Sequence, residues 1–486
     1  MYNPNTKFPV YDIDEWWADD WDAGIYAQEI NWQNSFFSQL STLFNRVPHA
    51  ARWVIQCENS DYSNQINESR NCYLIFGGLN DENCDYGHIV WNCTDSMDNL
   101  YIFKSESCYE CIDVLNCNKI VYSQECEGCA ESVGLYDCKG CVNCIGCVGL
   151  VNKSFCIFNK QKTKEEYAKF IEENPLSDPK VIKKIVEEKE KLRTSLPQRA
   201  FFGFRNNDVS GNHIYNAHNI HYSFDVKRGE NSKFCFTVRE AMDSYDISFT
   251  GNASESYNCL TLVDSARTIA SHNITDSHDI FYSDSCFGCN NIFGCYGLRK
   301  KSYCILNKQY TKEEYGKLVP ELIELMKQHN EWGKFFPKEL SPFGYNEAIV
   351  NEYSPLSKED ALKEGWGWQD DIPSTSGQET KKHTELPTDP RNYSNDLLKD
   401  ILACEKCGKN YRLINRELGF YKKHSLQIPT KCFNCRHTRR MTARNPRLLW
   451  DTTCAKCDAE IKTSYTPELQ KIYTLYCEKC YQQEIY

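Results

Sequence analysis

The chain has 486 residues, a formal net charge of −11, and 28 cysteines against 5 methionines. This length predicts two to four domains. No basic region followed by an apolar run opens the chain, and no stretch approaches the length of a membrane span, so we expect neither a signal peptide nor a transmembrane helix. So many cysteines without an export signal favour a cytoplasmic location, with metal or core roles rather than disulfides.

Residues 1–56 are aromatic and acidic, and they become amphipathic between Phe36 and Phe44. We expect this segment to form an N-terminal aromatic and helical cap.

The cysteines between residues 57 and 304 lie on a three-residue grid. All fourteen from Cys57 to Cys156 have numbers divisible by three, and the six from Cys235 to Cys304 lie one residue above a multiple of three. The other grid positions carry mostly Ser, Ile, Val, Leu or Gly. One residue in three therefore faces a crowded, dry interior, which is typical of a repeat architecture.

A longer spacing of eighteen residues runs through the same grid, as in Cys93, Cys111, Cys129 and Cys147. It predicts a mainly β fold with helical caps, in which two tandem β-solenoid (β-helix-like) units have about eighteen residues per coil. The predicted units cover residues 57–162 and 201–310. Strand geometry places inward residues two apart, so a strict period of three needs contributions from corners, and the cross-section and handedness stay open.

The two units are copies of each other. Residues 141–167 and 289–315 are identical at 18 of 27 positions, at an offset of 148. Each copy then enters a helical segment, at residues 163–200 and 311–340, that begins with a capping box: Thr163 with Glu166, and Thr311 with Glu314. We expect these helices to cover the open solenoid ends. Residues 341–400 become rich in Pro, Ser, Thr and charge, which predicts a linker region.

The C-terminal segment carries the most specific chemical signal, four CxxC pairs. Two such pairs supply four thiolates at the spacing of a tetrahedral zinc site, so we predict two Zn²⁺ ions in a small zinc-ribbon or treble-clef pair, residues 401–450 and 451–486. Four protein ligands leave no position for water, which indicates structural rather than catalytic zinc. The predicted ligands are Cys404, Cys407, Cys432, Cys435, Cys454, Cys457, Cys477 and Cys480.

The same segment carries a family resemblance. The stretch from CEKCGKNYR to CFNCRHTRR resembles small zinc-binding ribbon domains, and the stretch ending in YCEKCY resembles another common bacterial ribbon. With its NKQYTKEEY repeats and its WWADDWD opening, the whole chain resembles an uncharacterised cysteine-rich family of candidate-phyla bacteria. Members sometimes carry a CoA-transferase label, but this sequence lacks the alternating βαβ pattern of such a fold. The resemblance thus implies zinc ribbons and supplies no activity.

Charge is divided unevenly along the chain. Residues 401–486 carry a formal +8 and the preceding residues −19. After Cys435, four arginines fall on one face of a predicted helix: Arg436, Arg439, Arg440 and Arg444. Such a face suits nucleic-acid phosphates or the acidic patch of a protein partner. Docking onto the acidic solenoid of the same chain, or a solvated face without a binding role, are the alternatives.

Two weaker patterns remain. Residues Cys138 to Cys147 form CxxCxxCxxC, which on its own suggests zinc or an iron–sulfur cluster. However, Ile292 replaces Cys144 in the second copy, and this favours small core residues. Five histidines lie off the inward grid and are expected in solvent or in a ligand groove: His213, His218, His221, His272 and His278.

The sequence contains no phosphate-binding glycine loop, HExxH motif or GxSxG elbow. We therefore predict a non-enzymatic zinc-binding scaffold or interaction protein, with nucleic acid or a protein as the partner of its basic C-terminal segment. One alternative is an enzyme with its site in a groove of the β-solenoid. The other is a metal-storage or metal-cluster protein that uses the solenoid cysteines.

Overall fold

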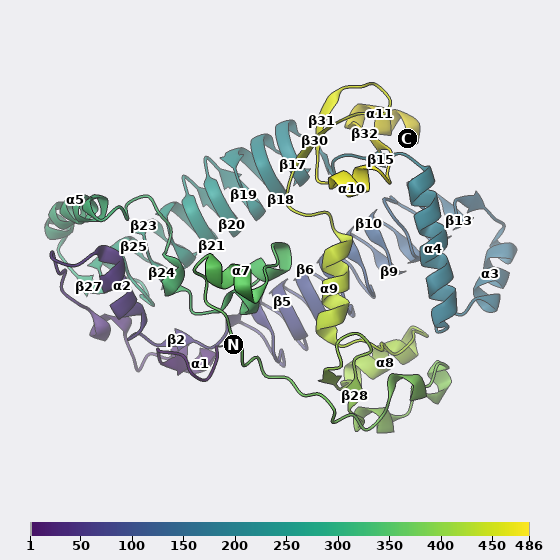
Figure 1. Cartoon of the computed structure of the whole chain (residues 1–486), viewed down its shortest axis with the longest axis horizontal. Coiled ribbons are helices and arrows are strands. Elements are labelled where there is room, and N and C mark those ends of the chain that lie inside the picture. Colours follow the sequence, from purple (N-terminus) through teal and green to yellow (C-terminus); the bar gives the residue numbers. More distant parts are fainter. Residues whose placement is uncertain (1, 486) are drawn as a thin grey trace.

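The computed structural model describes residues 2–485, and β-strands dominate it. Figure 1 shows two stacks of strands, one blue and one teal, with helices at their ends and along their sides. The first stack contains β3 (Val54–Ile55), β4 (Asn64–Asn67), β5 (Tyr73–Leu79), β6 (Asp85–Trp91), β7 (Leu100–Phe103), β8 (Ile112–Leu115), β9 (Asn118–Val121), β10 (Gln124–Glu127), β11 (Ala130–Val133), β12 (Val142–Ile145), β13 (Ser154–Ile157) and β14 (Lys160–Gln161).

The second stack begins after residue 200. It contains β16 (Gly203–Phe204), β17 (Asn207–Tyr215), β18 (His218–Lys233), β19 (Phe236–Met242), β20 (Tyr245–Ser254), β21 (Tyr257–Ile269), β22 (His272–Thr275), β23 (His278–Phe281), β24 (Asp284–Phe287), β25 (Asn290–Phe293), β26 (Ser302–Ile305) and β27 (Lys308–Gln309). In both stacks the neighbouring strands are parallel, except for the short antiparallel strands β14 and β27 at the ends.

The strand register gives the length of one layer. Leu100 pairs with Ile112 in the first stack, and Tyr245 pairs with Tyr257 in the second. The offset is 12 residues in both cases, and only the first pairings of the second stack use 11. This arrangement is compatible with a solenoid-like fold, but the prediction of eighteen residues per coil is wrong. Eighteen is also a multiple of three, so inward residues recur at that spacing without sharing a column.

Backbone geometry explains the three-residue grid. Every third residue from Gln56 to Phe158, and again from His213 to Leu306, has a positive φ. The residue that follows each of these corners is the inward one, so a 12-residue layer has four sides of three residues. Asn, Asp and Gly tolerate left-handed backbone better than other residues, and they occupy many of the corners.

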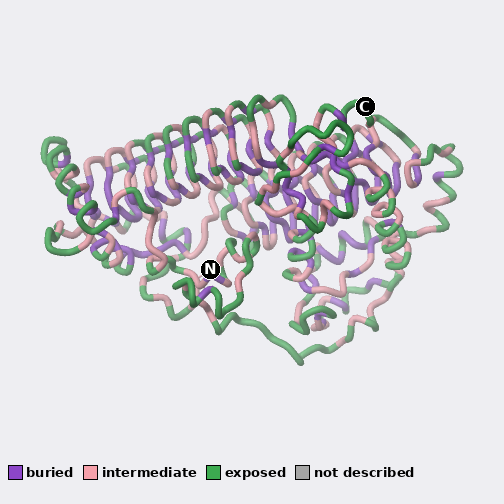
Figure 2. The backbone as a smooth tube through the Cα atoms, turned by 45° about the horizontal axis from the view of Figure 1, so that its top comes forward, coloured by how far each residue is buried: buried purple, intermediate pink, exposed green. Residues whose placement is uncertain are grey.

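The inward side chains satisfy main-chain groups that the strand pairing leaves free. The Cys108 N–H donates to the Ser96 hydroxyl at 3.1 Å, and the Ser69 N–H donates to the Cys57 Sγ at 3.4 Å. The Cys111 thiol donates to the Ile120 carbonyl at 3.4 Å. Buried backbone groups need partners, so small residues with a donor and an acceptor recur at inward positions. Figure 2 shows buried positions recurring along both stacks.

Helices follow each stack where the sequence predicts them. After the first stack come α3 (Lys164–Glu173) and α4 (Pro179–Ser195), and after the second comes α5 (Lys312–Gln328). Both capping boxes are confirmed, Thr163 with Glu166 and Thr311 with Glu314. The N-terminal helix α2 (Phe36–Phe44) lies against the last layers of the second stack, where Phe36 contacts Tyr282 and Phe293.

The remaining elements are short. They are β1 (Val10–Tyr11), α1 (Ile13–Trp17), β2 (His49–Ala50), β15 (Gln198–Arg199), α6 (Val350–Tyr353), α7 (Lys358–Lys363), β28 (Leu402–Ala403), β29 (Asn410–Tyr411), α8 (Asn415–Lys423), α9 (Phe433–Ala443), β30 (Trp450–Thr453), β31 (Glu460–Thr463), α10 (Pro467–Gln470), β32 (Leu475–Tyr476) and α11 (Glu478–Ile485), with short 3₁₀ turns between some of them. Within residues 2–485, no helix combines the length and the apolar character needed to cross a bilayer.

Candidate metal centres

The first cysteine cluster lies between a two-stranded hairpin and a helix. Cys404 and Cys407 lie between β28 and β29, and Cys432 and Cys435 lie at the start of α9. Gly408 has a φ of +71° and donates its N–H to the Cys404 carbonyl at 2.9 Å, which closes the tight turn of the knuckle. The four Sγ atoms lie within 4.8 Å of one another, and those of Cys407 and Cys432 are 3.7 Å apart.

The second cluster repeats this design. Cys454 and Cys457 lie between β30 and β31, and Cys477 and Cys480 lie at the start of α11. The Cys457 and Cys477 Sγ atoms are 3.8 Å apart, and all four Sγ atoms lie within 4.8 Å of one another. The Cys477 N–H donates to the Cys454 Sγ at 3.2 Å.

The donor geometry fits a tetrahedral metal ion. Zn–S bonds of about 2.3 Å in a tetrahedron place neighbouring sulfurs about 3.8 Å apart. Burial raises the pKa of Cys404, but the backbone N–H groups of Cys432 and Cys407 outweigh it and lower that pKa to about 6. The pKa of Cys454 is likewise lowered to about 6, against the effect of burial, by backbone N–H groups. Both clusters therefore suit a metal ion that binds thiolates.

The arginine face of α9 does not point to solvent. The Arg436 and Arg440 side chains are 4% and 1% exposed, and both pair with the Asp98 carboxylate of the first stack at 3.0 Å. Of the four predicted arginines, only Arg439 is largely exposed, at 51%, and it pairs with Glu110. The other three arginines are therefore buried within the chain. These arginines instead make the intramolecular contact with the acidic stack.

Arg444 continues this contact to both stacks. Its Nε lies 2.8 Å from the Asp113 carboxylate of the first stack, and its guanidinium lies 2.5 Å from Asp225 of the second. Arg447 adds a 2.8 Å contact with Asp225. The three side chains Arg444, Asp113 and Asp225 are 6–8% exposed. This cluster joins the C-terminal segment to both stacks. Loss of either partner of a buried ion pair strongly destabilises a protein, because it leaves the other charge buried and unpaired.

His213 belongs to the same cluster. Its side chain is only 12% exposed, and its Nε2 lies 2.9 Å from Glu125. Burial lowers the pKa of His213, but Glu125 and Asp113 outweigh it and raise that pKa to about 9. Burial raises the pKa of Glu125 to about 7. The placement of His213 in solvent or a groove is therefore wrong, whereas His218 and His278 are exposed as expected.

A third group of possible metal ligands escaped the sequence analysis. His88 on β6, Glu352 on α6 and His437 on α9 bring their donor atoms within 4.8 Å of one another. The His437 Nε2 lies 2.9 Å from the Glu352 carboxylate, and the His88 Nδ1 lies 3.7 Å from it. Burial, together with the neighbouring His437 ring, lowers the pKa of His88 to about 3. No spacing motif links these residues, because three distant segments supply them.

The cysteines of CxxCxxCxxC are accounted for by the fold. Cys138, Cys141, Cys144 and Cys147 occupy the four inward positions of one layer and are buried. Their thiols donate to main-chain carbonyls, such as that of Leu150 at 3.3 Å from Cys141. Within residues 2–485 they do not form a group with donor atoms close enough for one metal ion. The contacts agree with small core residues.

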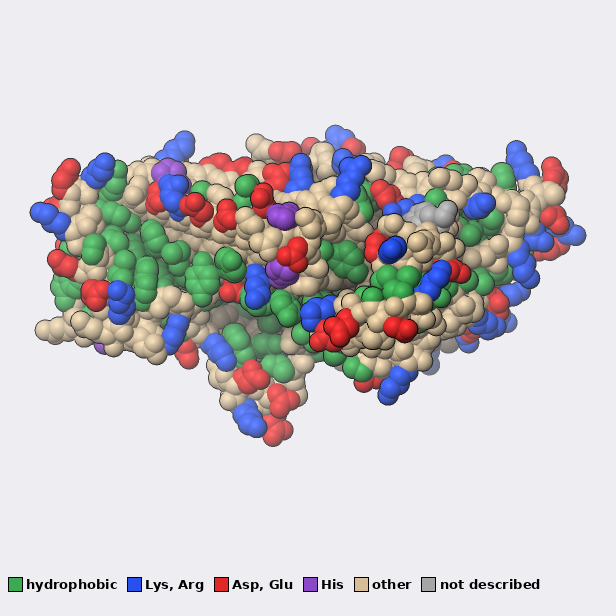
Figure 3. Space-filling model, turned by 90° about the horizontal axis from the view of Figure 1, so that it is seen from above, with side chains coloured by type: hydrophobic (Ala, Val, Ile, Leu, Met, Phe, Trp, Pro, Cys, Tyr) green, Lys and Arg blue, Asp and Glu red, His purple; other side chains and the backbone are tan. Residues whose placement is uncertain are grey.

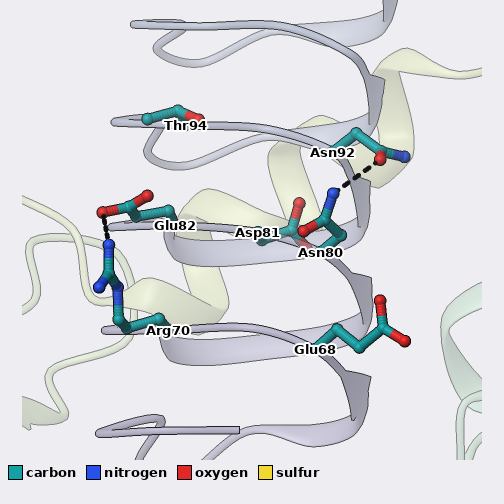
Figure 4. A pocket seen from close by; sticks show the side chains of 7 residues that line it. All are labelled: Glu68, Arg70, Asn80, Asp81, Glu82, Asn92 and Thr94. Atoms are coloured by element: carbon teal, nitrogen blue, oxygen red, sulfur yellow. Dashed lines mark hydrogen bonds and ion pairs between the residues drawn. The ribbon is translucent and has the colours of Figure 1, made fainter. Parts of the chain in front are cut away.

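A surface pocket lies elsewhere on the first stack, and Figure 4 shows its residues. It has a volume of about 330 Å³ and is lined by Glu68, Arg70, Asn80, Asp81, Glu82, Asn92 and Thr94. Asn80 donates to Asn92 at 3.0 Å, and Arg70 pairs with Glu82. A second pocket, of about 400 Å³, lies near Arg205. Neither pocket includes the cysteine or histidine clusters.

Comparison of the chain with models of known protein families and with curated proteins finds no match.

Proposed function

We propose that this protein is a non-catalytic scaffold in which two structural zinc ions fasten the C-terminal segment across two β-solenoid units. The closed geometry of the two four-thiolate clusters carries the proposal, because it offers sites for metal without an open position for substrate. The 28 free thiols suit a reducing compartment, and we place the protein in the cytoplasm.

Metal and scaffold are coupled through α9. Cys432 caps this helix and Cys435 lies in its first turn, while Arg436 and Arg440 of the same helix reach Asp98. A metal bound by the two cysteines would hold the start of the helix in place. It would thereby orient the arginines before they are buried. On this proposal zinc acts on the fold and not on a substrate.

The test is metal quantification by mass spectrometry on the purified full-length protein. We expect two zinc ions per chain. Cys407→Ser and Cys457→Ser should each lower the content to about one ion, since one site loses a ligand. Cys111→Ser is the matched control, because its thiol bonds to backbone carbonyls, and it should keep both ions. Fewer than two ions in the wild-type protein, or metal loss in the control, would contradict the proposal.

The His88, Glu352 and His437 group supports a second candidate, an additional metal site with catalytic capacity. Two imidazoles and a carboxylate leave positions open for water or substrate on a metal ion. The same quantification tests it. A third ion that disappears in His88→Ala, while the two zinc ions remain, would favour the enzyme alternative.

A further inference from the structure

One side of the second stack exposes a ladder of aromatic residues. We call it the aromatic face and define it by residues 221–222, 233–234, 245–246 and 257–258, which occupy the same side of four successive layers. Tyr222, Phe234, Tyr245 and Tyr257 are 42%, 37%, 48% and 40% exposed. Figure 3 shows hydrophobic side chains gathered over the half of the molecule where the second stack lies in Figure 1.

The internal duplication identifies the equivalent face of the first stack. At the offset of 148, Phe234, Tyr245 and Tyr257 correspond to Tyr86, Met97 and Tyr109. These three residues are 4%, 1% and 3% exposed. The equivalent faces of the two stacks therefore differ in exposure. The face of the first stack is almost completely buried, and the face of the second stack is substantially exposed.

The C-terminal segment accounts for the difference. The Tyr109 ring contacts Tyr421 of α8 at 5.8 Å, and the Tyr86 ring contacts Phe433 of α9 at 5.4 Å. Asp98 receives Arg436 and Arg440 on the same face. No element of residues 2–485 provides an equivalent cover for the second stack, so its face keeps the exposure given above.

The later layers of both stacks are covered alike, which marks the limits of the exposed area. Ile145 and its equivalent Phe293 are both fully buried. Tyr282 is covered by Phe36 and Trp332, and at the other edge Lys462 of β31 reaches Tyr222 at 5.9 Å.

At about 200 Å² per ring, the four half-exposed aromatics of the aromatic face offer roughly 300–400 Å² of apolar surface. The largest apolar patch on a typical monomer covers about 300–600 Å² and is often functional.

We infer that a second copy of this chain covers the aromatic face. A helix like α8 does not fit there, because Arg416, which pairs with Asp85 in the first stack, would meet Lys233 at the equivalent position. The face is complementary to itself instead, because it carries both signs of charge. Lys233 lies 4.8 Å from the centre of the Phe234 ring. Asp246, one layer further, is exposed, forms no ion pair within 4.0 Å in residues 2–485, and feels the charge of Lys233 of its own chain.

These charges find partners in a symmetric dimer. Its two-fold axis lies in the interface, parallel to the strands, between the layer of Lys233 and the layer of Tyr245. It sets Lys233 of one copy onto the Tyr245 ring of the other and beside Asp246. The aromatic rings of the two copies then exclude water around these contacts. The inference is independent of the metal proposal, since no cysteine ligand lies on this face.

Sedimentation velocity and light scattering on the full-length protein test the inference over a concentration series up to about 100 μM, where mass action favours a dimer. We expect twice the chain mass. Tyr245→Glu should raise the dimer dissociation constant about tenfold or more, because it places a charge among buried rings. Met242→Glu is the matched control, exposed at 49% on the adjacent side of the same region, and it should leave the dimer intact.

A charge exchange makes the test specific. Lys233→Asp or Asp246→Lys alone should weaken the dimer. The double variant Lys233→Asp/Asp246→Lys should bind more tightly than either single variant, because the ion pair is restored with its signs exchanged, while the cation–π contact with Tyr245 is not. A monomer at every concentration overturns the inference. So does a dimer that Tyr245→Glu leaves unchanged, or a double variant weaker than either single one.

Discussion

Arg440 and Asp98 lie 342 residues apart in the sequence and meet in a buried ion pair at 3.0 Å. The Arg436 guanidinium reaches the same Asp98 oxygen, so one carboxylate of the first stack receives two arginines of α9. This pairing turns the basic C-terminal segment toward its own chain. It also explains how a segment of formal charge +8 lies on a chain that is otherwise acidic.

Replacement of Arg440 should destabilise the protein. Arg440→Met leaves Asp98 with less compensation in a buried position, and we expect a loss of about 3–5 kcal/mol in the free energy of unfolding. Chemical denaturation followed by fluorescence measures it. Arg439→Met, at an exposed side chain of the same helix, should cost about 1 kcal/mol or less. If both variants lower the free energy of unfolding equally, the buried ion pair contributes no more to stability than the exposed one.

Removal of metal should release α9 from the stack. Chelation of the first cluster takes away the ligand bonds that hold Cys432 and Cys435, so amide hydrogen exchange should accelerate within residues 433–443. Strand β12 in the core of the first stack should keep its protection and serves as the internal control. If hydrogen exchange in α9 is unchanged after complete metal loss, the metal is not needed to hold α9 against the first stack.

The inward cysteines should tolerate serine but not aspartate. In Cys111→Ser the hydroxyl can bond to the Ile120 and Tyr109 carbonyls that the thiol now contacts, and the cost should be roughly 1–3 kcal/mol. Cys111→Asp buries an unpaired carboxylate and should cost several kcal/mol more. Thermal unfolding of the two variants decides it. If both are equally destabilised and both lose metal, the inward cysteines are ligands.

Asp81 should make the protein less stable as the pH rises. Burial raises the pKa of Asp81 from 3.8 to about 8. The unfolded chain releases this proton above pH 3.8 and the folded chain only near pH 8, so stability falls between these values. Asp81→Asn keeps an acceptor for the Cys93 N–H but loses the one for the Leu79 N–H. We expect a net gain on the order of 2–4 kcal/mol at pH 8. The exposed substitution Asp61→Asn is the control, and an Asp81→Asn protein with the wild-type pH profile would contradict the argument.

His213 should contribute stability at low rather than high pH. Its pKa is raised from 6.5 to about 9 by Glu125 and Asp113, against the effect of burial. The contribution is complete below pH 6.5 and is lost as the pH rises through about 9. His213→Gln should therefore cost about 2–3 kcal/mol at pH 6 and little at pH 10. Glu125, Asp113, Asp225 and Arg444 all face the ring. His213 lowers the pKa of Glu125, so the difference between the two pH profiles reports the joint contribution of His213 and Glu125.

The repeat and its interior could be predicted from the sequence because they are local. A positive φ at every third residue makes the next side chain point inward, so the inward positions recur along the chain itself. The same holds for the capping boxes at Thr163 and Thr311, and for the pairs of cysteines that form each knuckle. Residues a few positions apart are brought together by backbone geometry alone.

The layer length and the ligand groups between segments depend on tertiary structure. Cys93 and Cys111 share the grid, but the register shows that columns advance by 12 residues, because four corners close one layer. His88 and His437, or Arg440 and Asp98, meet only when the C-terminal segment packs against the first stack. The sequence contained the charges for that packing. Which arginine meets which carboxylate was decided by the folded surface, because burial and distance set the energy of an ion pair.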